Sequence, residues 1–470
     1  MSNSVQNTIN NKTLDKVVTF GKDLGWSSLY FLGIGGIGMS AIARFFLANK
    51  NNVGGYDKTP SAITNNLEEN SALITFDDTI EAIPKLFLDN SKTLVIYTPA
   101  IPKSHQQFNF FKENGFTVLK RAELLGKITE RSFCLAVAGT HGKTTTSAIL
   151  GHILTEVKAT SFLGGITENY HSNLILGKDK VTVVEADEFD RSFLQLSPDI
   201  ACITSMDADH LDIYGEASLL EKSFVDFSNK VTKTLIVAKG LPIEGLTYAI
   251  NEDADYIAFN LKIATGKYVF DVQTPSEIIR NIEFYLPGKH NVMNALAATA
   301  MALNYGVSSE VIKRKLKTFT GVERRFSYKI NSPELVLIDD YAHHPTEINA
   351  VYKAAREMYG NKKLLVVFQP HLFSRTQDFA NDFATVLSQF NEIALLDIYP
   401  ARELPIEGVD SAWLFDKINS NNKKLVAKDA VVTTIKNSDA KIVLMLGAGD
   451  IGVLIQEVTK QLKTTIINEA

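Results

Sequence analysis

The feature that most constrains the fold is an alternation of apolar, β-branched runs with segments of helical period, which occurs in three successive blocks. Such an alternation is typical of parallel sheets with helices on both faces. The blocks begin with the run at 28–32, near Arg121 and near Pro333. A chain of 470 residues is long enough for about two to four domains. We therefore predict an α/β protein of three domains, placed at 1–120, 121–327 and 328–470.

A glycine-rich loop follows the first apolar run of the second block, in the sequence AVAGTHGKTTT at 136–146. It satisfies the phosphate-loop pattern G-x-x-x-x-G-K-[ST] except for the first glycine, where Val137 stands. Glycine lets backbone N–H groups approach an anion, and the amphipathic helix that follows adds the positive end of its dipole. We predict that this loop binds ATP through Gly139, Thr140, His141, Gly142, Lys143, Thr144 and Thr145. The alternative is an ordinary glycine-rich turn.

Polar residues at two further strand ends indicate a metal site beside that loop. Glu185 ends the apolar run VTVVE, and His210 lies in MDADHLD after the run IACIT. Both can reach one cation together with the hydroxyl of Thr144, because ligands of open α/β sheets bind at the carboxyl ends of the strands. The alternative for each acid or histidine is a helix cap or a salt bridge.

Two segments fit the dinucleotide spacing G-x-G-x-x-G, and they are not equivalent. GIGGIG at 33–38 is followed 24 residues after its first glycine by Asp57, which can meet a ribose, whereas GAGDIG at 447–452 favours helix–strand packing. Packing alone is also the alternative for the first copy. We predict a nucleotide-binding site at the first copy, formed by Gly33, Gly35, Gly36, Gly38, Met39, Ser40 and Asp57.

Composition excludes several classes of partner. The net charge of −5 offers no basic surface for nucleic acid, and no apolar run approaches the roughly 20 residues that span a bilayer. The two cysteines have no metal-ligand spacing, and the polar N-terminus has no apolar signal core. We expect a cytoplasmic protein, a monomer or a weak homodimer, that binds small molecules and neither nucleic acid nor membranes.

Eight motifs in order resemble those of the Mur ligases across nearly the whole chain: GIGGIGMSAIA, AGTHGKTTT, EADE, DADHLD, GKHNVMNALAA, GVERRF, DDYAHHPTEI and FQPHLFSRT. The resemblance implies an N-terminal Rossmann-like domain for a uridine nucleotide, a central P-loop ATPase-like domain and a C-terminal Rossmann-like domain that helps bind the amino acid. It also implies a reaction in peptidoglycan precursor synthesis. ATP phosphorylates the lactyl carboxylate of UDP-N-acetylmuramate, and the amine of L-alanine attacks the acyl phosphate to give an amide.

The resemblance also assigns roles to single residues. It implies that Thr144, Glu185 and His210 hold Mg²⁺, that His290 and Asn294 lie near adenine, and that Asp340 lies near the nucleotide. Catalysis is expected to rest on Lys143, His210, Arg325 and His344. The amino acid is expected to contact Tyr341, His344, His371 and Arg375. His344 precedes Pro345 and has the alternative of a helix N-cap, and Arg375 has that of a surface ion pair.

Some positions depart from the family pattern or leave choices open. Phe189 follows EADE where the family usually has serine, so the chain lacks that hydroxyl toward the sugar side of the substrate, and Asp190 and Ser192 are the candidates to compensate for it. Lys222 is at a suggestive distance for the carbamoylated lysine of some relatives, and the sequence does not decide its state. The runner-up function is a recycling ligase that attaches a ready-made peptide to the same sugar nucleotide. A nicotinamide-dependent oxidoreductase or a nucleotide-regulated switch would each explain only one of the two glycine loops.

Overall fold

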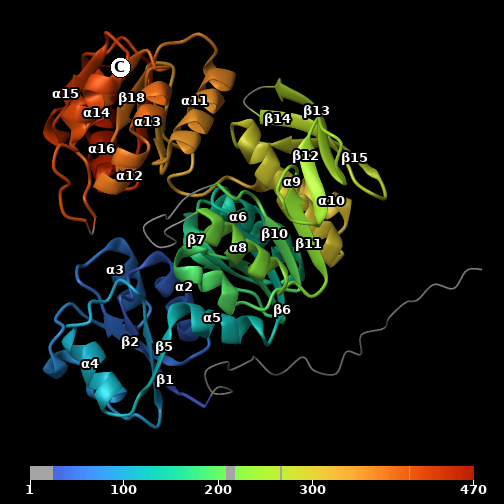
Figure 1. Cartoon of the computed structure of the whole chain (residues 1–470), viewed down its shortest axis with the longest axis vertical. Coiled ribbons are helices and arrows are strands. Elements are labelled where there is room, and N and C mark those ends of the chain that lie inside the picture. The colour runs from blue at the N-terminus through green and yellow to red at the C-terminus, as the bar shows by residue number, and fades with distance from the viewer. Residues whose placement is uncertain (1–24, 208–216, 265–266, 402, 470) are drawn as a thin grey trace, which may run out of the picture.

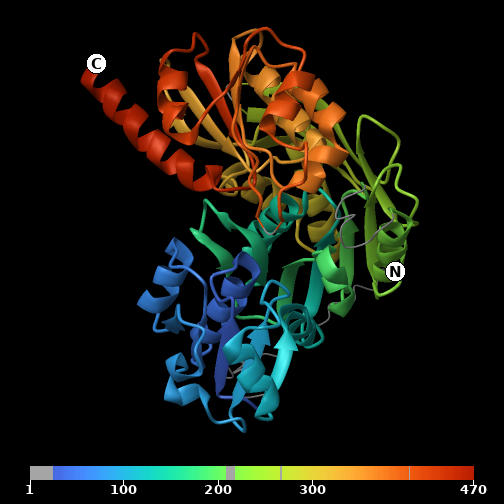
Figure 2. The same ribbon diagram turned by 60° about the vertical axis from the view of Figure 1, so that its left-hand side comes forward.

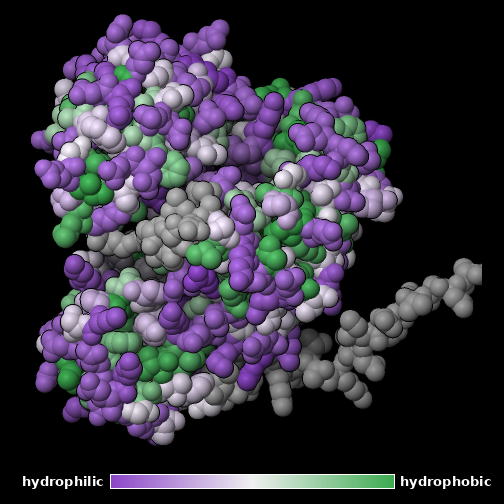
Figure 3. All heavy atoms as spheres, viewed as in Figure 1, coloured by the Kyte–Doolittle hydropathy of each residue, from purple (hydrophilic) through white to green (hydrophobic). Residues whose placement is uncertain are grey.

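The computed structural model describes residues 25–207, 217–264, 267–401 and 403–469. Each of the three blocks of the chain forms its own sheet with helices packed against it. In both views the central domain lies between the N-terminal domain, in blue, and the C-terminal domain, in orange and red (Figures 1 and 2). On the face in Figure 3, hydrophobic residues are scattered in small groups among polar ones. The three-domain α/β fold predicted from the alternating pattern is confirmed.

The N-terminal domain is built on a five-stranded parallel sheet in the order β3-β2-β1-β4-β5. All five residues of the central strand are buried, which is why the run at 28–32 is apolar almost throughout. The strands are β1 (Ser28–Leu32), β2 (Asn52–Tyr56), β3 (Leu73–Thr75), β4 (Thr93–Tyr97) and β5 (Thr117–Lys120). The helices are α2 (Ile37–Ala48), α3 (Ala62–Glu69), α4 (Gln106–Glu113) and α5 (Arg121–Thr129).

The central domain has a ten-stranded sheet in the order β15-β14-β13-β12-β11-β10-β6-β9-β7-β8. Six neighbouring pairs are parallel, but β8, β14 and β15 pair antiparallel at the two ends of the sheet. The strands are β6 (Phe133–Ala138), β7 (Thr160–Thr167), β8 (Ser172–Ile175), β9 (Val181–Glu185), β10 (Ile200–Ile203), β11 (Thr234–Ala238), β12 (Leu246–Ile250), β13 (Tyr256–Ala264), β14 (Lys267–Gln273) and β15 (Ile278–Phe284). The α-helices are α6 (Lys143–Leu154), α8 (Ala217–Ser228), α9 (Lys289–Tyr305) and α10 (Ser309–Thr318).

The C-terminal domain has a six-stranded sheet in the order β16-β17-β21-β18-β19-β20, parallel except for β16. Its strands are β16 (Ser327–Asn331), β17 (Val336–Asp340), β18 (Leu364–Phe368), β19 (Glu392–Leu395), β20 (Lys423–Leu425) and β21 (Ile442–Leu446). The α-helices are α11 (Pro345–Tyr359), α12 (Phe373–Asp378), α13 (Ala380–Leu387), α14 (Ser411–Lys417), α15 (Val431–Lys436) and α16 (Ile451–Glu469). None of the helices in the described ranges combines the length and the apolar character that a membrane span requires.

The carboxyl ends of the strands carry the polar segments that the sequence singled out. The glycine loop at 139–142 follows β6, Glu185 ends β9, and Asp340 ends β17. Residues of all three domains line one cavity of about 530 Å³, among them Ile37 from the N-terminal domain and His371 from the C-terminal one. The functional site therefore has to be sought where the domains meet.

Candidate active site

The phosphate loop is shaped by two glycines in the left-handed region of backbone conformation. Gly139 has φ of 132° and Gly142 has φ of 83°, which other residues adopt only with strain. A Cβ atom on Gly142 would also lie 2.6 Å from Asn294 Oδ1. Because Gly142 is the N-cap of α6 and has no side chain, the first-turn N–H groups stay open to an anion. Val137 is fully buried within β6, so the missing glycine of the pattern falls in the sheet and not in the loop.

Lys143 at the start of α6 is held by a buried carboxylate. Its Nζ lies 2.7 Å from Glu188 Oε2 and donates a hydrogen bond of 2.6 Å to the carbonyl of Gly139. Burial alone would lower the pKa of Lys143, but the carboxylates of Glu188, Asp187 and Glu185 outweigh it and raise that pKa. Glu188 itself is fully buried. The lysine is therefore charged and lies within the loop that is predicted to take the phosphates.

The structure brings together two of the three predicted metal ligands. Thr144 Oγ1 donates a 2.9 Å hydrogen bond to Glu185 Oε1, while the N–H of Gly164 donates to Oε2 at 2.9 Å. Burial raises the pKa of Glu185, although the charge of Lys143 and the hydrogen bonds from Thr144 and Gly164 act in the opposite direction. The donors are oxygens, which Mg²⁺ prefers. His210 lies outside the described residues, and within the described ranges no group of three or more His, Cys, Asp and Glu side chains is arranged as a metal site.

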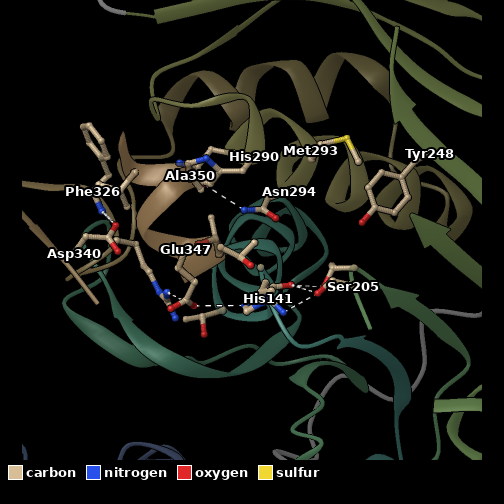
Figure 4. A pocket seen from close by; sticks show the side chains of 18 residues that line it. His141, Ser205, Tyr248, His290, Met293, Asn294, Phe326, Asp340, Glu347 and Ala350 are labelled. Carbon is tan, nitrogen blue, oxygen red and sulfur yellow. Dashed lines mark hydrogen bonds and ion pairs between the residues drawn. The ribbon is translucent and has the colours of Figure 1, made fainter. Parts of the chain in front are cut away.

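A cavity of about 280 Å³ lies between α6, α9 and the start of α11, next to the phosphate loop (Figure 4). Of the residues predicted to bind ATP, it is lined by His141, Gly142, Thr144, Thr145, His290, Asn294, Arg325 and Asp340. Burial and the nearby guanidinium of Arg325 lower the pKa of His290 to about 4, so this imidazole is neutral. Burial raises the pKa of Asp340 to about 6, although its oxygens accept hydrogen bonds from the N–H groups of Phe326 and Ala342.

The cavity that all three domains line holds the predicted amino-acid contacts. Tyr341, His371 and Arg375 line it together with Lys143, Thr144 and Glu185. Arg375 is almost completely buried, and its Nη1 lies 3.3 Å from His371 Nδ1. Arg375 is therefore a buried part of the cavity wall and does not lie on the protein surface.

A third cavity, of about 1100 Å³, lies at the first glycine loop. It is lined by Gly33, Gly35, Gly36, Gly38, Met39 and Asp57, as predicted for a nucleotide site. Asp57 Oδ2 accepts a 2.7 Å hydrogen bond from the N–H of Gly35, and a Cβ atom on Gly35 would lie 2.8 Å from the same oxygen. The carboxylate therefore closes the loop at the end of β2, beside the space left for a ligand.

Comparisons with known proteins place the whole chain in one family. Residues 28–133 match the model "Mur ligase family, catalytic domain", 137–302 match "Mur ligase middle domain", and 324–454 match "Mur ligase, glutamate ligase domain". The UDP-N-acetylmuramate--L-alanine ligase of Christiangramia forsetii is 59% identical over 92% of this chain and 97% of its own length. That of Flavobacterium psychrophilum is also 59% identical, over 93% of this chain and 98% of its own. The chain belongs to the Mur ligases.

Solved structures of Mur ligases share the three-domain arrangement. The UDP-N-acetylmuramate-alanine ligase of Thermotoga maritima superposes with a TM-score of 0.81, at 27% identity, over 93% of this chain and 99% of that one. A murein peptide ligase from Psychrobacter arcticus superposes with a TM-score of 0.66, at 20% identity, over 92% and 98%. At that identity the second likeness concerns the fold alone.

Three of the described residues predicted for this Mur ligase site line none of the three cavities, namely Ser40, Gly139 and His344. His344 is the N-cap of α11; its Nδ1 accepts a 3.3 Å hydrogen bond from Thr346, and its ring packs edge-on against Phe379. His344 therefore caps the helix, and its neighbour His343 lines the cavity, while the predicted contact of His344 with the amino acid stays a prediction. Ser40 is fully buried in α2 and its hydroxyl accepts a hydrogen bond from Asn173 of the central domain, while its contact with the nucleotide stays a prediction. Gly139 begins the phosphate loop and packs against Thr204, because a Cβ atom built on Gly139 would lie 2.1 Å from Oγ1 of Thr204.

The positions that depart from the family pattern also have defined places. Phe189 lines both the glycine-loop cavity and the cavity between the three domains, while Asp190 and Ser192 line only the former. Asp190 and Arg191 have φ of 52° and 53°, which turns the chain sharply beside the cavity. Lys222 is exposed on α8. No described contact bears on its modification.

The second G-x-G-x-x-G segment serves packing, as predicted. A Cβ atom built on Gly447 would lie 2.7 Å from the carbonyl oxygen of Gln369. One on Gly449 would lie 2.6 Å from the ring of Tyr399, and one on Gly452 would lie 2.3 Å from Nη1 of Arg324. The close approach of Gln369, Tyr399 and Arg324 therefore requires glycine at these three positions.

Three further residues belong to the site of this Mur ligase although sequence reasoning gave them no role in it. Glu188 pairs with Lys143, Glu347 lines two cavities, and Arg121 lines the glycine-loop cavity. The last acid of EADE was a signal for Glu188. Glu347 was visible only as a helix-capping acid, and Arg121 gave no signal beyond its place near a domain boundary.

Proposed function

We propose that this Mur ligase joins L-alanine to the lactyl carboxylate of UDP-N-acetylmuramate, with ATP converted to ADP and phosphate. The relatives at 57–59% identity that carry this name support the assignment, because each aligns over at least 92% of this chain. The proposal extends to a cytoplasmic enzyme with domains at 1–120, 121–327 and 328–470. It also includes a monomeric or weakly dimeric state.

One observation of the structure carries the proposal. The cavity between the three domains connects a phosphate loop on the central sheet with a wall of Tyr341, His371 and Arg375 on the C-terminal sheet. Phe189 lines this cavity and the one at the first glycine loop. A sugar nucleotide anchored at that loop would extend past Phe189 to present its carboxylate to Lys143. The three substrates would then meet in one enclosed space.

The first chemical step brings two anions together and so depends on positive charge. Lys143 and Arg325 both line the cavity, and neither is strongly exposed. We assign them to the phosphates of ATP, where they stabilise charge as the γ-phosphoryl group moves to the carboxylate oxygen. Thr144, Glu185 and His210 would hold Mg²⁺, which when bound supplies further charge to the phosphates. His290 and Asn294 would contact adenine, and Asp340 the nucleotide beside them.

The second step requires the amine of L-alanine to point at the carbonyl carbon of the acyl phosphate. We assign the carboxylate of L-alanine to Arg375, whose guanidinium can bind it through two parallel hydrogen bonds. His371 contacts Arg375 and fixes its position from the side. Attack by the amine forms the C–N bond, releases phosphate and leaves an amide once the nitrogen has lost its proton.

The deciding experiment offers the purified enzyme ATP, Mg²⁺ and UDP-N-acetylmuramate with either single amino acids or short peptides. ADP release with L-alanine and little with L-alanyl peptides is the expected result. Preference for a ready-made peptide would replace the proposal by its runner-up, the recycling ligase. The oxidoreductase and switch alternatives are tested in the same assay, because neither would form an amide.

A further inference from the structure

We propose that Glu347 is a positioning residue through which the C-terminal domain holds the phosphate loop and Arg325 in their working arrangement. The inference rests on the proposed function for the identity of the two ligand cavities. The carboxylate of Glu347 contacts His343 on the C-terminal side of the chain, and His141 and Arg325 on the side of the central domain.

The two oxygens of Glu347 face different partners. Oε2 accepts hydrogen bonds from the N–H groups of His343 at 2.9 Å and His344 at 3.2 Å, and therefore caps α11. Oε1 points the other way, where it lies 3.6 Å from Nδ1 of His141 and 3.7 Å from Nη1 of Arg325 (Figure 4). One oxygen thus serves the helix, and the other serves the site.

His141 makes this contact an interdomain one. It is the third residue of the loop GTHGKT, and its Nε2 lies 3.3 Å from Asp207 Oδ2 of the central domain. Its imidazole therefore lies between a carboxylate of its own domain and one on α11. Only the second contact depends on where the C-terminal domain lies. The loop that is assigned to the phosphates is thereby connected to the domain that is assigned to the amino acid.

Glu347 is largely shielded from solvent and is negatively charged. The side chain is 16% exposed, and it lines both the cavity at His290 and the cavity at Arg375. The contacts with His343, His141 and Arg325 outweigh burial and hold the pKa of Glu347 well below its usual range. A carboxylate fixed in this way restrains two cations that border the phosphate positions, which a helix cap alone would not require.

The Glu347→Gln variant separates the two roles. The amide oxygen can still accept the cap hydrogen bonds, while the amide NH₂ replaces Oε1 and presents donors to His141 and Arg325. We expect the Kd for a non-hydrolysable ATP analogue, measured by calorimetry, to rise about tenfold, and kcat to fall by at least as much. The Kd for UDP should stay within a factor of about two, which separates this effect from a general loss of folded protein.

Two controls make the result decisive. The first control is Glu357→Gln. Glu357 lies on the same helix and accepts a hydrogen bond from the hydroxyl of Tyr268 in the central domain, so this variant also removes a carboxylate that contacts that domain. Glu357 lines none of the three cavities. This variant should leave the ATP analogue and kcat unaffected. In a double-mutant cycle, Glu347→Gln should weaken ATP-analogue binding less in a His141→Asn background than in the wild type. An unchanged Kd and kcat in Glu347→Gln, equal losses in Glu357→Gln, or full additivity with His141→Asn would overturn the proposal. Binding of the ATP analogue does not require any particular acceptor, so a failed ligase assay would count against the proposed function and not against this inference.

Discussion

Nζ of Lys143 lies 2.7 Å from Oε2 of Glu188, a carboxylate with no exposed surface. The phosphate-loop lysine thus completes a buried ion pair as well as facing the cavity. Removing one member of a buried pair leaves an uncompensated charge and costs about 3–5 kcal/mol. The same contact therefore affects stability and catalysis, and the two effects can be measured separately.

Lys143→Ala should abolish ADP formation, because loss of a preorganised charge costs roughly 3 kcal/mol or more, about a hundredfold in rate. It should also lower the melting temperature, since Glu188 loses its cation. The double variant Lys143→Ala/Glu188→Gln should recover the melting temperature and remain inactive. Normal turnover in the single variant would remove Lys143 from the mechanism.

Glu185→Gln should raise the Mg²⁺ concentration needed for half-maximal activity by about tenfold or more, while the KM for L-alanine changes little. The reason is that a ligand oxygen is lost beside Thr144, whereas the amino-acid wall is untouched. His210→Ala should behave in the same way. Removal of Mg²⁺ by a chelator should stop the reaction, and added Mg²⁺ should restore it. Equal effects on Mg²⁺ and on L-alanine would point to a general disturbance.

Arg375→Lys should lower kcat/KM for L-alanine by about 2 kcal/mol, roughly thirtyfold, because a lysine cannot reproduce the planar pair of hydrogen bonds. Binding of an ATP analogue should be unchanged. Alanine amide lacks the carboxylate, so it should be a poor acceptor for the wild type and lose little more in the variant. A similar loss with both acceptors would mean that Arg375 acts elsewhere.

Arg121→Gln should weaken the binding of UDP by about tenfold or more and leave uridine nearly unaffected. Among the described residues that line the glycine-loop cavity, Lys58 and Arg121 carry the permanent positive charges. Arg121 also lies against the loop, because its Nη1 would be 2.3 Å from a Cβ atom built on Gly38. Lys92→Gln is the control in the same domain, because Lys92 pairs with Asp89 and neither residue lines that cavity. Titration calorimetry with both ligands distinguishes a diphosphate contact from a fold defect, which would weaken uridine equally.

His141 predicts a pH dependence of stability. Burial lowers its pKa, but Asp207 and Glu347 outweigh burial and raise the pKa to about 9, above the ordinary value of 6.5. A raised folded-state pKa of a base means that the protonated form stabilises the fold. This contribution, on the order of 2 kcal/mol, is complete below about pH 6.5 and is lost as the pH rises through about 9. Calorimetric melting curves of wild type and His141→Asn should therefore converge between pH 7 and pH 9.5; a constant difference would contradict the prediction.

Local patterns predicted what depends on local chemistry. The strand at 28–32, the glycine loop before Lys143 and the meeting of Thr144 with Glu185 follow from apolar runs and from the common edge where parallel strands end. The resemblance to the Mur ligases, and not the strand pattern alone, assigned Tyr341, His371 and Arg375 to the amino acid, and the structure has all three in the lining of one cavity.

What the patterns did not predict depends on how the domains lie against each other. The contact of Glu347 with His141 joins residues that are far apart in sequence, and a capping acid at the start of a helix gives no sign of it. Ser40 follows the glycine loop as a binding residue would, yet its turn of α2 faces Asn173 of the next domain. The antiparallel strands β14 and β15 extend a sheet that alternation alone predicted to be parallel.

The walls of the cavity between the three domains come from separate sheets, and this separation bears on how such enzymes diversify. The residues proposed to bind the amino acid, Tyr341, His371 and Arg375, come from the C-terminal domain, while the glycine loop proposed to bind the sugar nucleotide comes from the N-terminal domain. A chimaera that exchanges only the C-terminal domain would thus inherit a new acceptor preference and keep its sugar nucleotide. It would remain active only where the incoming helix still offers a carboxylate to the histidine of the resident phosphate loop.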